Sequence, residues 1–126
     1  MLKKILYPEL SYKITGLCFQ VHKKLGRLAR EKQYADYLEH LLKEQQIKFK
    51  REIKIPFQPN QTLIEGNIAD FIIENKIIID CKAKRAVTKQ DYYQIQRYLQ
   101  ATKIKLGLII NFNDRYLKPR RIINYS

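Results

Sequence analysis

The sequence predicts one α/β domain with a mixed β-sheet flanked by helices, in the order α-α-β-β-β-α-β-β. Two observations carry this prediction. Some segments repeat apolar residues at helical spacing, and others show the alternation or the β-branched runs of strands. A helix between two later strands is the crossover that a mixed sheet requires. The 126 residues contain no linker or internal repeat, so we expect a single domain over residues 1–126.

The helical segments are bounded by the residues that commonly start and stop helices. Pro8 suits the start of the first helix and Gly26 its end. Thr88 is a candidate N-cap for the third helix, with Asp91 in its first turn. The expected helices are residues 9–25, 29–46 and 89–102.

The strand segments differ in their exposure pattern. The first alternates apolar and charged residues, which predicts one buried face. The second and third are joined by a turn at Asn75 and are rich in isoleucine. The fourth is almost wholly apolar, as expected of a central strand covered on both faces. The expected strands are residues 47–57, 63–74, 76–84, 105–111 and 121–125.

The charge balance points to a polyanionic partner. The chain has 25 Lys and Arg against 12 Asp and Glu, a formal net charge of +13. From the charge, nucleic acid is the first candidate and an anionic membrane surface the second; a basic background composition without any partner is the alternative. No apolar run reaches the roughly 20 residues of a membrane span, and the N-terminus does not resemble a signal peptide. We therefore expect a soluble, cytoplasmic protein with two buried cysteines.

Three ionisable residues interrupt the isoleucine-rich hairpin. Asp80 and Lys82 lie on the same face of their strand because side chains alternate. If the hairpin turns at Asn75, Asp70 lies opposite Asp80, within roughly 5 Å. Two carboxylates this close repel each other unless a cation such as Mg²⁺ lies between them. The alternative is a salt bridge between Asp80 and Lys82 at a strand end, with Asp70 in a turn.

The same residues resemble the signature of a known family. Asp70 together with Asp80-Cys81-Lys82 is similar to the core motif of the PD-(D/E)XK nuclease superfamily. This resemblance implies a restriction-endonuclease-like fold and a nuclease that uses Mg²⁺ or Mn²⁺ and hydrolyses phosphodiester bonds of nucleic acid, with DNA favoured over RNA and RNA left open. Asp70 and Asp80 would bind the metal with the backbone carbonyl of Cys81, and Lys82 would position the attacking water and stabilise charge.

Further motifs extend the resemblance over nearly the whole chain. Residues 94–98 resemble the Q-x-x-x-Y motif of the RecB and lambda exonuclease branch, and residues 31–34 resemble the E-x-x-Y of the small GxxExxY proteins. Residues 21–26, 98–102 and 107–112 also resemble the GxxExxY proteins. One position departs: the family glycine three residues before Glu31 is Leu28 here. We therefore expect a tighter or more helical turn before Glu31.

The resemblance implies roles for four more residues, three of which have an alternative. Glu31 would be an additional acidic ligand, directly or through water, or else a solvated residue. His22 matches a histidine that contacts the metal in some relatives, although a packed, hydrogen-bonded histidine is the more common case. Gln94 and Tyr98 would lie near the metal and the substrate phosphate, with Tyr98 serving mainly as core in the alternative. Tyr34 we expect in the core.

Basic residues flank the expected site in two groups. They would hold backbone phosphates without reading base sequence, or else form a solvated surface. A nuclease with so small a domain would gain specificity from a homodimer, a protein partner or DNA structure. The rival function is a basic module of the same fold that binds nucleic acid without cutting it. The candidate nucleic-acid-binding residues are Lys84, Arg85, Lys89, Arg97, Arg115, Lys118, Arg120 and Arg121.

Overall fold

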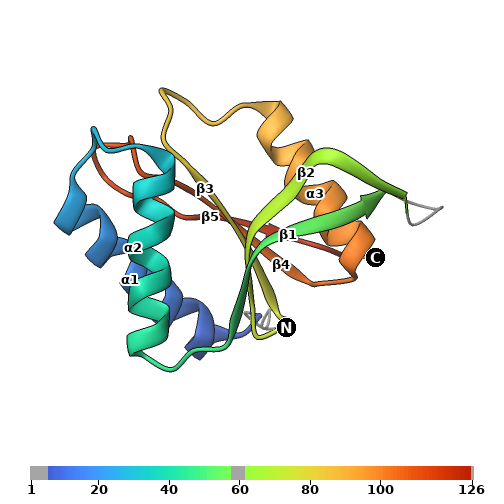
Figure 1. Ribbon diagram of the computed structural model, residues 1–126, viewed down its shortest axis with the longest axis horizontal. Coiled ribbons are helices and arrows are strands. Elements are labelled where there is room, and N and C mark those ends of the chain that lie inside the picture. The colour runs from blue at the N-terminus through green and yellow to red at the C-terminus, as the bar shows by residue number, and fades with distance from the viewer. Residues whose placement is uncertain (1–5, 58–61, 126) are drawn as a thin grey trace, which may run out of the picture.

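The computed structural model describes residues 6–57 and 62–125 and has the expected element order (Figure 1). The sequence prediction of three helices and five strands is confirmed, with ends that differ by about two residues. The elements are α1 (Pro8–Leu25), α2 (Glu31–Glu44), β1 (Phe49–Phe57), β2 (Thr62–Ile73), β3 (Ile77–Lys82), α3 (Lys89–Thr102), β4 (Leu106–Asn111) and β5 (Arg120–Ile123).

The five strands form one mixed sheet in the order β1-β2-β3-β4-β5. Only β3 and β4 are parallel, and α3 is the crossover between them; the other neighbours are antiparallel. Helices α1 and α2 lie on one side of the sheet and α3 on the other (Figure 1). The predicted mixed sheet flanked by helices is therefore confirmed.

Each face of the sheet has its own apolar core. On the α1–α2 face, residues such as Val21, Leu38 and Phe71 are fully buried. On the α3 face, Ile95 and Leu99 pack against β4. Helix α3 approaches β4 so closely at Gly107 that a Cβ there would lie 2.8 Å from Ile95 Cδ1.

Both cysteines belong to the core of the α1–α2 face. Cys18 and Cys81 are buried free thiols, as the sequence predicts. Burial raises the pKa of Cys18 to about 12 and that of Cys81 well above its usual value. Neither thiol is therefore a nucleophile at neutral pH.

The connection between α1 and α2 is not helical, so the expectation of a more helical turn is wrong. Gly26 ends α1 with a φ of 74°. Arg30 is extended, with φ −87° and ψ 153°, so α2 begins at Glu31 rather than at residue 29. The Tyr34 hydroxyl donates to the Gly26 carbonyl and accepts from the Ala29 amide at 3.2 Å, which closes the loop.

Candidate active site

Strand β3 carries the charged residues on one face only. Ile79 and Cys81 face the α1–α2 core, whereas Asp80 and Lys82 face α3. Side chains alternate along a strand, so two polar positions at this spacing share one face. The row lies at the carboxyl end of β3, where the strand leaves the sheet and the loop to α3 begins (Figure 1).

Asp70 lies where β2 stops pairing with β3. The paired residues, for example Phe71 with Ile79, follow the register predicted for a turn at Asn75, and the pairing ends at Phe71. In place of the next ladder bond, Asp70 Oδ2 accepts the Cys81 amide N–H at 2.7 Å. The carboxylate is thus fixed beside Asp80 by the backbone of the strand that carries Asp80.

Next to Asp70, the side chains of β1 and β2 change the face of the sheet to which they point. Phe71 belongs to the α1–α2 core, but Ala69, two residues earlier on β2, belongs to the α3 core. On β1, Arg51 lies over the Phe71 ring whereas Ile53 packs on the α3 side. Between these two positions Glu52 has a φ of 54°, a conformation that L residues seldom adopt. The sequence has no glycine at this position to signal the irregularity.

The two aspartates perturb each other. Burial, contact with the Asp80 carboxyl and repulsion from its charge raise the pKa of Asp70 to about 8. Asp80 is only 3% exposed, and its Oδ2 accepts no well-aligned hydrogen bond from the described residues. Lys82 Nζ lies 3.1 Å from this oxygen and supplies the nearby positive charge. A cation bound between the two carboxyl groups would relieve their repulsion.

Lys82 is held between several acceptors. Its Nζ lies 3.5 Å from Gln94 Oε1 and 3.8 Å from Asp91 Oδ1, in addition to its contact with Asp80. Burial lowers the pKa of Lys82, but the charges of Asp80, Asp91 and Glu31 outweigh this effect and raise it. Lys82 therefore stays protonated and can donate hydrogen bonds or stabilise negative charge.

The helix-derived candidates lie at different distances from the acid pair. Gln94 reaches Lys82, and Tyr98 donates to the Ile68 carbonyl at 3.2 Å while its buried ring packs in the α3 core. Glu31, the first residue of α2, interacts electrostatically with Lys82 and Asp80. Partial desolvation by its surroundings raises its pKa, and Lys82 opposes this rise.

His22 has a structural partner in this structure. Its Nε2 lies 2.9 Å from the carbonyl oxygen of Asp114, in the loop between β4 and β5. Within the described part of the chain, no three His, Cys, Asp or Glu side chains lie close enough together to hold an ion. The structure thus brings Asp70 and Asp80 together but does not group His22 or Glu31 with them.

The candidate basic residues are spread over more than one surface. Lys84 Nζ forms an ion pair with Asp91 Oδ2 at 2.5 Å. Arg120 and Arg121 lie on opposite sides of β5: Arg120 donates to the Tyr92 hydroxyl, and Arg121 donates to Ser11 Oγ at 2.6 Å, beside α1. Arg85, Lys89, Arg97, Arg115 and Lys118 are exposed.

Two buried polar residues support the site and were not predicted for that role. Asp91 both caps α3, by accepting from the amide and hydroxyl of Thr88, and anchors the two lysines. Asn111, only 2% exposed, accepts from the Lys84 amide and donates to the Lys84 carbonyl. The Thr88-x-x-Asp91 capping spacing is the sequence signal for Asp91. For Asn111 the signals are its place at a strand end and within residues 107–112, which resemble the GxxExxY proteins.

The donor set fits a hard divalent cation. Two adjacent carboxylates, one with a buried unbonded oxygen, suit Mg²⁺ or Mn²⁺, which prefer oxygen ligands. Mg²⁺ commonly uses one or two carboxylates and completes its shell with water and substrate phosphate. An acid pair without a third protein side chain is consistent with this habit.

An acid pair and a lysine at the end of a central strand, in a mixed sheet between helices, define a restriction-endonuclease-like domain. The chain belongs to the PD-(D/E)XK nuclease superfamily, whose family model matches residues 8–122. Members generally use divalent metal ions and act on nucleic acid. No curated protein and no solved structure matches the chain significantly. The narrower resemblance to the RecB and lambda exonuclease branch and to the GxxExxY proteins stays a prediction.

Proposed function

We propose that this protein hydrolyses phosphodiester bonds of DNA and requires Mg²⁺ or Mn²⁺. The observation that carries the proposal is the juxtaposition of Asp70, Asp80 and Lys82 at the end of β3, with Asp70 bound to the Cys81 amide and Lys82 Nζ 3.1 Å from Asp80. A divalent ion at such a site activates water and neutralises phosphate charge.

The chain's own residues have distinct roles in this proposal. Asp70 and Asp80 hold the ion, together with the Cys81 carbonyl. Lys82 donates to the attacking water or a phosphate oxygen, and Gln94 and Asp91 keep its ammonium in place. Glu31 would contribute to holding the ion only through water, since its carboxylate interacts electrostatically with Lys82 and Asp80. Tyr98 packs in the α3 core and holds β2 in place through its hydrogen bond to the Ile68 carbonyl.

The exposed cations next to the site bind the substrate backbone in this proposal. Arg85 lies in the loop that follows β3, Lys89 is the first residue of α3, and Arg97 lies further along that helix. Contacts of this kind add affinity that falls with salt and carry no sequence information. Sequence or structure specificity would come from a homodimer, a protein partner or the form of the DNA. In the described part of the chain, no helix is long and apolar enough to cross a membrane.

The net charge of +13 also favours a second candidate, a module that binds nucleic acid without cutting it. Binding a polyanion does not require a buried and a half-buried carboxyl group that repel each other. Asp70 and Asp80 add negative charge next to the basic residues and so weaken this alternative.

The deciding experiment measures cleavage of labelled single-stranded, duplex and branched DNA with Mg²⁺, Mn²⁺ or EDTA. We expect metal-dependent cleavage by the wild type, and a loss of at least a hundredfold in Asp80→Asn and Lys82→Ala. Lys23→Ala, which removes an exposed lysine of α1, is the matched control and should cut normally. Binding without cleavage by the wild type in either metal would replace the nuclease proposal with the binding module.

A further inference from the structure

Two loops meet beside the candidate active site and form a single surface. They are residues 26–30, between α1 and α2, and residues 112–118, between β4 and β5; we call them the two-loop rim. Arg27 Nε donates to the Asn113 carbonyl at 3.0 Å, and Asn113 Nδ2 donates to the Arg27 carbonyl at 3.2 Å. The stack of Tyr34 on Phe112, with ring centroids 4.5 Å apart, joins them from below.

The rim is connected to the strand that carries the catalytic candidates. The Phe112 amide donates to the Lys82 carbonyl at 2.9 Å. Glu31 follows the first loop directly. A nucleic acid with a phosphate at Asp70 and Asp80 would therefore pass over or next to the rim.

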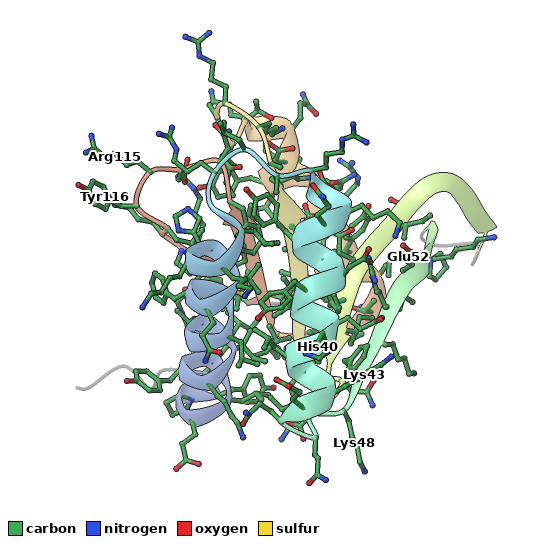
Figure 2. All side chains as sticks on the ribbon, turned by 60° about the vertical axis from the view of Figure 1, so that its left-hand side comes forward. His40, Lys43, Lys48, Glu52, Arg115 and Tyr116 are labelled. Atoms are coloured by element: carbon green, nitrogen blue, oxygen red, sulfur yellow. The ribbon has the colours of Figure 1, made fainter. Side chains whose placement is uncertain are left out.

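The rim exposes apolar side chains that the fold does not use. Leu28 is 92% exposed and Tyr116 is 70% exposed, whereas the neighbouring Leu117 is buried and anchors its loop. Figure 2 shows Arg115 and Tyr116 projecting from the loop away from the body of the domain. The Arg115 guanidinium lies 5.5 Å from the centre of the Tyr116 ring, which preorders the two side chains.

The charge around these apolar residues favours a polyanion. Exposed cations on the rim are Arg27, Arg30, Arg115 and Lys118. Asp114 is the acidic residue of the rim, and its Oδ1 already accepts from Asn111 Nδ2. Cations interleaved with an exposed aromatic ring form the surface that single-stranded nucleic acids use, because phosphates meet the cations and bases stack on the ring.

A continuous duplex would leave the apolar part of this surface unused. Paired bases hide their faces inside the stack, so a duplex offers phosphates to Arg115 but no base plane to Tyr116. We infer that the two-loop rim binds unpaired nucleotides, and that the substrate carries a single-stranded segment next to the phosphate to be cut. The inference rests on the proposed function for its position beside a cleavage site.

Binding measured without metal separates this inference from the nuclease proposal. The assay is fluorescence anisotropy of a labelled single-stranded DNA and of the same sequence as a blunt duplex, both in EDTA at low salt. For Tyr116→Ala we expect about tenfold weaker single-strand binding and less than twofold change for the duplex. Tyr116→Trp should keep single-strand affinity, and Arg115→Ala should weaken both forms.

Tyr12→Ala is the matched control, because Tyr12 is an 84% exposed tyrosine on α1, outside the rim; its affinities should equal those of the wild type. Equal effects of Tyr116→Ala on both forms, no effect on either, or no wild-type binding would overturn the inference. If Tyr116→Ala left the affinity for both DNA forms unchanged, a protein partner would be the remaining candidate to bind the two-loop rim. Normal binding results with no cleavage in the earlier assay would remove the nuclease proposal alone.

Discussion

The two faces of the sheet use the same strands for different purposes. On the α1–α2 face, β3 contributes Ile77, Ile79 and Cys81 to a fully apolar core beneath two helices. On the α3 face, the same strand contributes Ile78 and then Asp80 and Lys82. Helix α3 mirrors this change: Ile95 and Leu99 are buried, but its first turn presents Asp91 to the lysines.

This contrast explains how a small domain tolerates two neighbouring carboxyl groups, one buried and one half-buried. The α1–α2 face supplies most of the apolar burial and holds the strand backbone in place. Because β3 is fixed from behind, its other face can hold Asp80 next to Asp70 of β2 at the end of the sheet, although the two carboxyls repel each other. Along β3, the residues that pack in the α1–α2 core therefore alternate with the candidate site residues Asp80 and Lys82.

Removing a large apolar side chain from the α1–α2 face should destabilise the protein more than any other change considered. Phe71→Ala removes a fully buried ring that contacts Phe49 edge-on, and should cost about 3–5 kcal/mol of the free energy of unfolding. Asp80→Asn keeps the shape of its side chain; it removes the ion pair with Lys82 but also the repulsion from Asp70, and because these two effects oppose each other it should change stability by no more than about 1 kcal/mol. Urea unfolding of both variants measures the contrast. If both substitutions lowered the free energy of unfolding equally, the two faces of the sheet would contribute alike to stability, which would contradict this prediction.

A smaller effect concerns the charged face and depends on pH. Asp70 has a pKa of about 8 in the metal-free fold against about 3.8 for an ordinary aspartate, so the folded state binds the proton more tightly than the unfolded state. Stability of the metal-free protein should therefore fall as pH rises from about 4 to about 8 and level off above. Glu31 acts in the same direction, because its pKa is also raised.

Asp70→Asn should flatten most of that slope and stabilise the metal-free protein by about 1–3 kcal/mol at pH 8.5. Its amide oxygen can still accept the Cys81 N–H. Thermal unfolding between pH 5 and 9 in EDTA checks the prediction. Asp91 is a useful comparison, because its pKa is lowered and its contribution is lost only as pH falls below about 4. A slope that survives the substitution would locate the titrating group elsewhere.

The sequence predicted which residues of β3 share a face, but not the contacts and backbone conformations that hold the candidate site in place. Alternation placed Asp80 and Lys82 on one face, and the turn at Asn75 set the register of the hairpin. The left-handed Glu52 could not be predicted, because no glycine marks it and only tertiary pairing imposes it. The clamp of Asn111 on Lys84 joins segments 27 residues apart, a contact that local patterns do not encode.

A still smaller change in stability is expected at Leu28, which stands where the resemblance to the GxxExxY proteins predicts a glycine. Leu28 is not among the described residues with positive φ, and its side chain is 92% exposed. The bend that needs glycine lies at Gly26 instead. Leu28→Gly should therefore lower the free energy of unfolding by no more than about 0.5–1 kcal/mol, through the greater freedom of the unfolded chain. Gly26→Ala, which forces φ of 74° on a residue with a Cβ, should cost more. If Leu28→Gly proved the stabilising change of the two, the loop before Glu31 would be strained at Leu28, and the position of Glu31 beside Lys82 would depend on that strain.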